Sequence, residues 1–200
     1  MKKSLFTLIL FTTISYSQCW QSLSTGSYHT AAVRNDGTMW TWGRNSYGQL
    51  GNGTIIDSNI QSQVGTDTNW VTVAAGGHFN VAIKSDGTLW SWGSNLYGTL
   101  GDGTTANRLV PIQIGTETNW TLLRIGFNHI MALKSNGTLW GWGRNFYGQL
   151  GDGTYTNRLM PTQIGTDLWT SIGTGGNFTL GIKQDGSLWA WGYNYYWQLA

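Results

Sequence analysis

The 200-residue chain is short of cysteine, proline and charge, and each shortage excludes a class of protein. Its single cysteine, Cys19, cannot form an internal disulfide, so the fold is not a cysteine-stapled scaffold. Without Lys2 and Lys3, nine basic residues face nine acidic ones, and this balance predicts no basic patch for a nucleic-acid backbone. The apolar run from Leu5 to Ile14 is too short for a membrane-spanning helix, which needs roughly 20 residues. Stability must therefore come from packing of the chain itself.

The N-terminal stretch MKKSLFTLILFTTISYSQ is typical of a secretory signal peptide, with two lysines, an apolar run and a small-residue end. We predict that residues 1–18 are removed and that the mature domain, residues 19–200, is secreted or held at the cell surface. Two alternatives stay open at this point. The stretch could be an apolar first strand, or the chain could be a lipoprotein with Cys19 lipidated, although Tyr16 and Gln18 fit such a cleavage site poorly.

What the chain has in abundance is glycine and tryptophan, with 29 and 13 residues respectively. Many tight turns and many large aromatic anchors favour an all-β protein over a disordered one. Tryptophan recurs at a fixed interval, since 50, 50 and 49 residues separate Trp40, Trp90, Trp140 and Trp189. This interval defines an internal repeat. The predicted repeats are residues 20–69, 70–119, 120–168 and 169–200, the last of them incomplete.

The second repeat has the pattern of one four-stranded blade of a β-propeller. We expect strands at WVTVA (70–74), FNVAIK (79–84), TLWSWG (88–93) and VPIQIG (110–115). Asp86-Gly87 predicts a tight hairpin between the second and third strands, because these residue types tolerate positive φ angles. The stretch before the fourth strand predicts an ordered loop, whose glycines adopt backbone conformations that a side chain would block. These glycines are Gly98, Gly101 and Gly103.

Paired tryptophans explain why DGTLWSWGSN recurs with small changes in every repeat. Residues two apart in a strand share a face, so the two indoles of each pair point the same way. The residue between them is always small: Thr41, Ser91, Gly141 or Ala190. We expect each pair to pack between neighbouring sheets, where an indole buries about 150–250 Å². The structural set is Trp40, Trp42, Trp90, Trp92, Trp140, Trp142, Trp189 and Trp191.

The stretch GSYHTAAVRNDGTMWTWGRNSYGQLGNGT (26–54), repeated as GFNHIMALKSNGTLWGWGRNFYGQLGDGT (126–154), resembles the repeat of the regulator of chromosome condensation (RCC1) family. The resemblance covers essentially the whole mature chain and implies a β-propeller with a role in protein binding. The eukaryotic nuclear member of that family is a guanine-nucleotide exchange factor that docks on nucleosomes. With its export signal and no basic tail, this chain is more similar to a bacterial secreted member. No functional residue carries over, because those of the relatives lie in variable loops.

The fourth repeat departs from the pattern at its end. It reads YWQLA where YGQLGDGT is expected, with Trp197 and Ala200 at positions that are glycine in the other repeats. We therefore expect an incomplete, open propeller in this chain. The chain is either a fragment of a longer protein or an arc that closes by self-association through its open terminal blade, whose uncovered edge would favour contacts with other chains.

The sequence offers no catalytic constellation. His29 and His129 occupy a repeat position filled by Phe79 and Phe178 in the other copies, which favours packing with one ring hydrogen bond over metal binding. The GDGT segments lack the ligand spacing of a calcium loop and the lysine of a phosphate loop, so Asp102 is expected to cap a turn. We predict that the chain is not an enzyme and binds no metal or cofactor.

Binding specificity is expected where residues vary between repeats while the frame stays fixed. Aromatic and arginine side chains are favoured anchors of interfaces. The candidate protein-binding residues are Arg44, Leu96, Arg108, Arg144, Phe146 and Arg158. The regular tyrosines of each repeat are instead expected to cover blade edges: Tyr47, Tyr97, Tyr147 and Tyr196.

The leading hypothesis is a secreted or cell-surface, non-catalytic scaffold that binds a protein of unknown identity through variable loops. One alternative is a regulator of the exchange-factor type, which rests on the family resemblance alone. Another is a structural or adhesion array. An enzyme would need acids and bases converging on a pocket, and the acidic residues mostly occupy repeated turns. The sequence does not identify the partner or the face that binds it.

Overall fold

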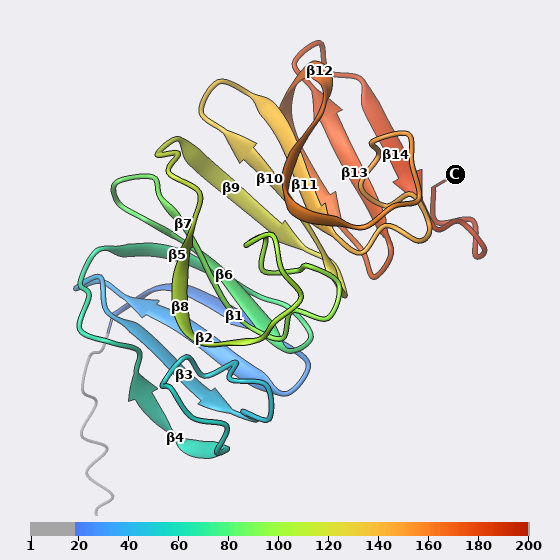
Figure 1. Cartoon of the computed structure of the whole chain (residues 1–200). Helices are drawn as coiled ribbons and strands as arrows, with labels where there is room; N and C mark the ends of the chain where they lie inside the picture. The colour runs from blue at the N-terminus through green and yellow to red at the C-terminus, as the bar shows by residue number, and fades with distance from the viewer. Residues whose placement is uncertain (1–18, 200) are drawn as a thin grey trace, which may run out of the picture.

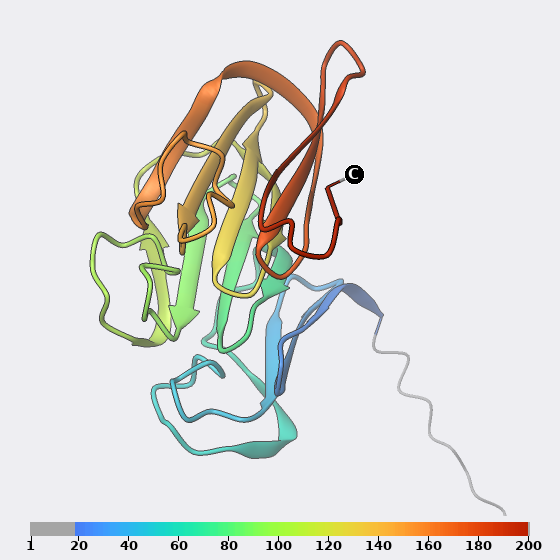
Figure 2. The same cartoon turned by 90° about the vertical axis from the view of Figure 1, so that its right-hand side faces the viewer.

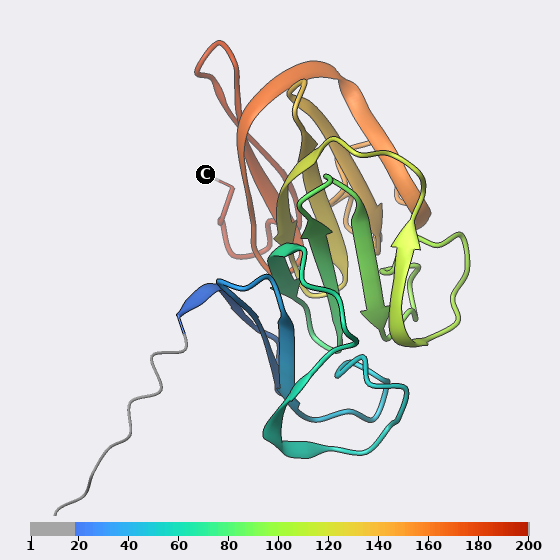
Figure 3. The ribbon, with the colours of Figure 1, turned by 90° about the vertical axis from the view of Figure 1, so that its left-hand side faces the viewer.

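The computed structural model describes residues 19–199, which form an all-β protein whose sheets follow one another along an open arc (Figure 1). This confirms the predicted fold class. The predicted signal peptide, residues 1–18, lies outside the described residues, as does Ala200. Views from both sides show the sheets stacked against one another around the curve (Figure 2, Figure 3). No helix among the described residues is long and apolar enough to cross a membrane.

Each of the first two blades is a four-stranded antiparallel sheet in sequence order. Blade 1 consists of β1 (Trp20–Thr25), β2 (His29–Arg34), β3 (Met39–Gly43) and β4 (Ser58–Gln63). Blade 2 consists of β5 (Trp70–Ala75), β6 (Phe79–Lys84), β7 (Leu89–Gly93) and β8 (Arg108–Ile114). The last strand begins at Arg108, earlier than the predicted residue 110, because Arg108 already pairs with Gly93.

The third and fourth blades share a strand. Blade 3 consists of β9 (Trp120–Ile125), β10 (His129–Lys134), β11 (Thr138–Gly143) and the first half of β12 (Arg158–Thr174). The second half of β12 begins blade 4 and is followed by β13 (Phe178–Lys183) and β14 (Leu188–Gly192). Because β12 runs on without a turn, the two blades form one six-stranded sheet. Within the described residues, β14 has no strand on its outer side.

A local hydrogen-bond relay explains the repeated Asp-Gly-Thr-Leu-Trp sequence. Asp86 Oδ1 accepts hydrogen bonds from Thr88 N and Thr88 Oγ1 at 3.0 and 2.7 Å, and Trp90 Nε1 donates to Thr88 Oγ1 at 2.9 Å. Gly87 has a φ of 77°, and a Cβ there would collide with the carbonyl oxygen of Thr118. The predicted hairpin therefore needs glycine for its backbone conformation and for the close approach of the next linker.

In blades 2 to 4 the second tryptophan of the pair connects the blade to the one before it. Trp92 and Trp142 are fully buried, and each indole Nε1 donates a 3.0 Å hydrogen bond to a carbonyl of the preceding blade, that of Gln49 or Thr99. The core around Trp92 comprises Ala31, Val33, Met39 and Val64 of blade 1 with Trp70, Val73 and Ala82 of blade 2. The predicted packing of the pairs between sheets is confirmed for these inner blades, whereas Trp189 of blade 4 is 50% exposed.

Lysines lie at the other end of the same interfaces, buried in blades 2 and 3 and partly buried in blade 4. Lys134 Nζ lies 3.5 Å from the ring centroid of Trp140 and 2.6 Å from Glu117 Oε2. Lys84 and Lys183 repeat the arrangement in blades 2 and 4. Each ammonium group leaves water but gains an indole face and a carboxylate, so its charge is compensated inside the frame.

Candidate functional site

The two ends of the blades differ in their connections and charge. We call the end with the turns between second and third strands, together with the linkers between blades, the hairpin end. The loop end comprises the first turns 26–28, 76–78, 126–128 and 175–177 and the long loops 44–57, 94–107, 144–157 and 193–199. The hairpin end, counted with the last residues of the second strands, holds six of the nine acidic residues and four basic ones. The loop end, counted with Arg108 and Arg158 at the first residues of β8 and β12, has three acidic residues and four arginines. The loop end therefore carries a small excess of positive charge.

Each long loop is organised around one asparagine. Asn95 Nδ2 donates hydrogen bonds to Asp102 Oδ1 and Thr104 O, both at 3.0 Å, and Asn95 Oδ1 accepts one from Leu100 N at 2.9 Å. Asn45 and Asn145 make the equivalent contacts in blades 1 and 3. The ordered loop predicted from the glycines is confirmed, with φ values of 74°, 77° and 80° at Gly98, Gly101 and Gly103. These loops form a defined platform for the side chains that they carry.

Two candidate binding residues, Arg108 and Arg158, are tied to their own loops. Arg108 Nη2 lies 2.6 Å from Asp102 Oδ2, and Arg158 Nη2 lies 2.6 Å from Asp152 Oδ2. Asp102 Oδ1 also accepts hydrogen bonds from Thr104 N and Oγ1, which confirms the predicted turn cap. Burial alone would raise the pKa of Asp102, but hydrogen bonds from Thr104 and Arg108 hold that pKa below its usual value. Replacing either arginine would therefore disturb the loop itself.

The two other arginine candidates lie against aromatic rings. Arg44 Cζ lies 5.5 Å from the ring centroid of Tyr28, which stacks on His78 at a centroid distance of 5.8 Å. The ring of Tyr47 lies 4.9 Å from the same imidazole. Burial, followed by the nearby charge of Arg44, lowers the pKa of His78, so this imidazole is neutral at pH 7. This group joins blades 1 and 2 at the loop end.

A larger group of rings spans blades 2, 3 and 4. Arg144 Cζ lies 5.3 Å from the ring centroid of Tyr97, 5.0 Å from that of Phe146 and 5.4 Å from that of Tyr147. Tyr147 in turn lies 4.8 Å from Tyr193. Phe146 is 52% exposed, so the group reaches the surface. We call the two groups together the aromatic–arginine face: Tyr28, Arg44, Tyr47, His78, Tyr97, Arg144, Phe146, Tyr147 and Tyr193.

The loop end exposes further large apolar side chains. Leu96, the remaining candidate, is 67% exposed. Other exposed side chains at this end are Phe127, Tyr155, Tyr195, Tyr196 and Trp197. Tyr47, Tyr97 and Tyr147 of the regular tyrosine position take part in the aromatic–arginine face, whereas Tyr196 at the same position is 75% exposed. These exposed side chains make the loop end a candidate interaction surface.

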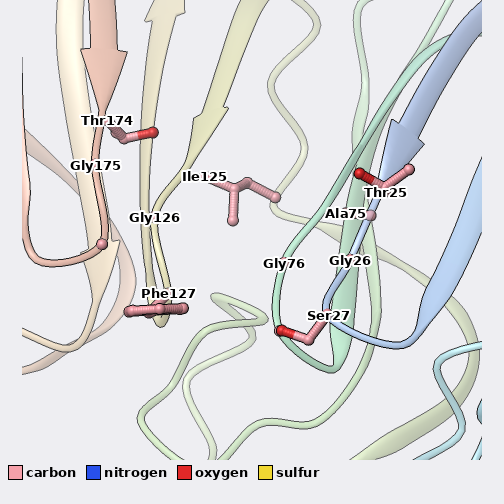
Figure 4. A pocket seen from close by; sticks show the side chains of 12 residues that line it. Thr25, Gly26, Ser27, Ala75, Gly76, Ile125, Gly126, Phe127, Thr174 and Gly175 are labelled. Carbon is pink, nitrogen blue, oxygen red and sulfur yellow. The ribbon is translucent and has the colours of Figure 1, made fainter.

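At the hub of the arc, the first turns of all four blades line a cavity of about 400 Å³. Figure 4 shows the ring of Phe127 and the side chain of Ile125 beside this space, with Thr25 and Ser27 across from them. No residue that lines the cavity has an ionisable side chain. The cavity thus presents apolar, hydroxyl and backbone groups, and its walls contain no acid–base pair for chemistry.

The histidines of the repeat are interior groups that join neighbouring blades. His29 Nε2 lies 2.9 Å from Asn80 Oδ1, and His129 Nε2 lies 3.1 Å from Thr179 Oγ1. The predicted packing role with one ring hydrogen bond is confirmed. Burial lowers the pKa of both residues, to about 4 for His129. Neither ring is presented to solvent as a proton-transfer group.

Sequence reasoning missed two features of this end. The organising role of Asn45, Asn95 and Asn145 had a signal, because the same residue type recurs at one repeat position. The rings around Arg144 had none, because they come from three different blades. Of the candidate residues, the structure brings Arg144 and Phe146 together and keeps Arg108 and Arg158 in separate loop bridges.

Comparison with protein families finds one repeat throughout the chain. The profile described as "Regulator of chromosome condensation (RCC1) repeat" matches residues 36–83, 86–133 and 136–182. A second profile with the same description matches residues 20–49, 70–99, 122–149 and 169–198. A search of curated proteins found no match.

Solved structures with the same fold include human WBSCR16, at 24% identity and a TM-score of 0.78, over 87% of this chain and 47% of that one. Yeast RCC1 (Prp20) bound to Kap60 matches at 24% identity and a TM-score of 0.77, over 88% of this chain and 44% of that one. Prp20p from Saccharomyces cerevisiae, described with its binding properties to Gsp1p and histones, matches at 20% identity, a TM-score of 0.77 and coverages of 88% and 46%. The chain thus spans somewhat less than half the length of these proteins.

Proposed function

The chain belongs to the regulator of chromosome condensation repeat family, and from that premise we propose that it is an exported, non-catalytic scaffold that binds a partner protein through its loop end. The observation that carries the proposal is the aromatic–arginine face. Tyrosine and arginine dominate the binding energy of protein interfaces, because each offers a large contact area together with a polar group.

The construction of the face supports recognition by a rigid surface. Asn45, Asn95 and Asn145 hold the loops that carry Arg44 and Arg144, so little conformational freedom is lost on binding. The residue types at the arginine position change from blade to blade, since Ser94 and Tyr193 replace arginine in blades 2 and 4. A fixed frame with varied tips is the usual arrangement of a binding protein.

The charge of the loop end favours an acidic surface on the partner. Asp102 and Asp152 are compensated by the arginines of their own loops. Within residues 19–199, Arg44 and Arg144 form no ion pair and keep their charge available at the rim of the aromatic groups. Complementary charges of this kind accelerate association and lose strength as salt rises.

A non-catalytic role is supported by where the titratable groups lie. The carboxylates at the hairpin end pair with buried lysines or cap turns, as Glu117 and Asp86 do. The histidines His29 and His129 are locked between blades. An acid and a base converging on one cavity, which hydrolytic chemistry needs, do not meet at the hub.

Export is proposed from the sequence of residues 1–18 alone. Sequencing the N-terminus of protein recovered from the culture medium and from the membrane fraction tests it. Cleavage next to Gln18 supports a secreted scaffold, and a blocked, lipid-bearing Cys19 would make the protein surface-anchored. An intact Met1 in the cell interior would contradict export.

The binding proposal is tested with the mature chain as bait for extracellular and surface proteins of its own cell. The test variant replaces Arg44, Arg144 and Phe146 by alanine. The matched control replaces Arg124 and Ile60, which also contribute an arginine and an exposed apolar side chain but lie in β9 and β4. We expect the wild type and the control to bind one partner saturably. The test variant should bind that partner with about a hundredfold lower affinity. High salt should dissociate the complex.

Both variants should first be shown to melt at the wild-type temperature, so that a loss of capture is not a loss of folding. Equal capture by the test variant and the wild type would overturn the assignment of the loop end. Hydrolysis of an ester or polysaccharide panel by clean protein, with no captured partner, would overturn the non-catalytic scaffold.

Self-association through blade 4 stays a prediction. The outer face of that blade exposes Leu188 and Ile182, at 69% and 39%, where the inner blades are covered. Sedimentation over a hundredfold range of concentration tests it. A rising mass that Leu188→Asp abolishes supports self-association, and a constant monomer mass contradicts it.

A further inference from the structure

The first strands of the four blades line a second cavity, of about 600 Å³, that continues the cavity at the hub. The two cavities share one wall residue from the end of each first strand: Thr25, Ala75, Ile125 and Thr174. We call the two cavities together the hub channel. Blade 3 has a blade on each side, since β9 contacts both β5 and β12, so its stretch of the channel wall is not an end of the arc.

Arg124 of β9 is the one ionisable residue among those that line the hub channel. Its side chain is exposed, and Nη1 donates a 2.9 Å hydrogen bond to Leu123 O of its own strand. Within residues 19–199, no carboxylate forms an ion pair with it. A guanidinium group has five N–H donors in one plane, a geometry that suits a carboxylate. The wall of the channel therefore offers a cation with donors to spare for an acidic ligand.

Hydroxyl groups line the same channel. Figure 4 shows the hydroxyl oxygens of Thr25, Ser27 and Thr174 turned toward the space between them. Further along the channel, Ser24 Oγ accepts a 2.9 Å hydrogen bond from Ala75 N, so its own proton is free to be donated. Because a hydroxyl group can both donate and accept, this wall suits a ligand that carries hydroxyl groups itself better than a purely apolar acid.

Phe127 supplies an aromatic wall where the channel opens at the loop end. A Cβ on Gly176 would lie 3.0 Å from the ring carbons Cδ2 and Cε2, so the ring lies directly on Gly176, yet the side chain is 60% exposed. An exposed ring of this kind packs against the apolar C–H face of a sugar ring, because both surfaces then leave water. Three residues separate Phe127 from Arg124, at most roughly 10 Å of extended chain, which two linked sugar rings can span.

The two large side chains stand at positions that are small in the other blades. The residues at the position of Arg124 are Ser24, Ala74 and Gly173. Those at the position of Phe127 are Ser27, Gly77 and Gly176. The position before Arg124 is instead aliphatic in every blade: Leu23, Val73, Leu123 and Ile172. The small residues leave room in the channel, and the arginine and the phenylalanine supply its specific contacts.

We propose that the hub channel binds an acidic oligosaccharide of at least two sugar rings, one of them a uronic acid. The carboxylate of the uronic acid pairs with Arg124, and a neighbouring ring lies against Phe127. Sugar hydroxyl groups exchange hydrogen bonds with the hydroxyl groups of Thr25, Ser27 and Thr174. Cavities of this size commonly hold small organic ligands. The site is separate from the aromatic–arginine face, to which neither Arg124 nor Phe127 belongs.

The probe is digalacturonate, titrated into the mature chain and followed by isothermal titration calorimetry. We expect saturable binding at a single site. Maltose, which has two neutral rings, and acetate, which has a carboxylate but no ring, should each bind at least about tenfold more weakly. Equal binding of maltose would overturn the role of the charge, and equal binding of acetate would overturn the role of the sugar rings. No saturable binding of digalacturonate at millimolar concentrations would overturn the site.

The protein variants are Arg124→Gln and Phe127→Ala, and the matched control is Ile60→Ala. All three side chains are exposed, so each variant should melt close to the wild-type temperature. We expect Arg124→Gln to weaken digalacturonate by at least about tenfold while maltose binds as before, because only the pairing of charges is lost. Phe127→Ala should weaken both sugars, and Ile60→Ala should leave both within about twofold. Unchanged binding of digalacturonate by Arg124→Gln would overturn the site.

The sugar site and the protein-binding face can fail independently. The alanine variant of Arg44, Arg144 and Phe146 should bind digalacturonate as the wild type does. The alanine variant of Arg124 and Ile60, which should retain the protein partner, should lose the disaccharide. Loss of the disaccharide in the first of these two variants would overturn the placement of the sugar in the hub channel.

Discussion

The hairpin end and the loop end are built on the same repeat and use it in opposite ways. At the hairpin end all four blades carry a cation over an indole and an Asp-Gly-Thr or closely related turn, and blades 2 to 4 also place an acid beside the cation. At the loop end the same strands carry Arg44, Ser94, Arg144 and Tyr193 at one position. Positions that hold the same residue type in every blade are buried between blades, whereas positions that differ from blade to blade are exposed.

Comparison of the four repeats with one another distinguishes the residues that pack the blades together from the candidate binding residues. A side chain that must fit between two blades meets the same surroundings four times, so the same residue recurs. A side chain at the loop tips has no such constraint from its neighbours. The aromatic and arginine residues gathered there are therefore the best candidates for contact with another molecule.

The largest effect is expected when a tryptophan buried between blades, rather than one exposed at the loop end, is replaced by alanine. Trp92→Ala should lower the free energy of unfolding by about 3–5 kcal/mol, because a fully buried indole and its hydrogen bond to Gln49 O are lost. Trp197→Ala, at an 83% exposed loop-end position, is the control and should cost less than about 0.5 kcal/mol. Urea unfolding measures both. Similar losses for the two variants would contradict the division into frame and surface.

Acid should weaken the interfaces between blades. Burial holds the pKa of His129 at about 4, below the ordinary 6.5, so the unfolded chain takes up this proton first as the pH falls. Stability is then fully present above pH 6.5 and decreases toward pH 4, by up to about 3 kcal/mol. The free energy of unfolding measured at several pH values shows the slope. His129→Phe, the residue type of Phe79 and Phe178 at this position, should flatten it, and an unchanged slope in that variant would contradict the assignment.

A smaller effect is expected from the acid partners of the buried lysines. Glu117→Gln leaves Lys134 between its indoles without the carboxylate 2.6 Å away. Because Glu117 is about half exposed to solvent, we expect a loss of about 1 kcal/mol in the free energy of unfolding. Raising the salt concentration should reduce the difference between variant and wild type. A more stable variant would show that the ion pair opposes folding.

The smallest effect on stability is expected at the loop end. Arg144→Ala and Phe146→Ala should each change the free energy of unfolding by less than about 0.5 kcal/mol, because Phe146 is half exposed and Arg144 stacks on rings that remain in place. Thermal unfolding of each single variant measures this. A loss above about 2 kcal/mol from either substitution would move that residue from the binding surface to the frame.

Much of the frame could be predicted from the sequence, because it follows from local rules repeated four times. Asp86-Gly87 marked a hairpin through backbone conformation, and the spacing of Trp90 and Trp92 marked a shared face. The long β12 could not be predicted, since residues 165–168 continue the strand although the equivalent segments in the other repeats turn. That difference depends on pairing with β11 and β13 on both sides.

The candidate site was predictable only in part. Varying positions singled out Arg44, Leu96, Arg144 and Phe146, and all of these lie at the loop end. The sequence did not separate them from Arg108 and Arg158, because a bridge to Asp102 or Asp152 is invisible until the loop is folded. The sequence does not give the distances between residues of the same loop or of neighbouring blades, and these are known only once the chain is folded.

Hydrogen exchange of the mature chain, alone and bound to the protein that it captures, tests the central claim most directly. The account predicts slower exchange at residues 44–48, 144–148 and 193–197 and no change at the hairpin end, around residues 84–90 and 134–140. Protection confined to the hairpin end, with the loop tips exchanging as in the free protein, would contradict it.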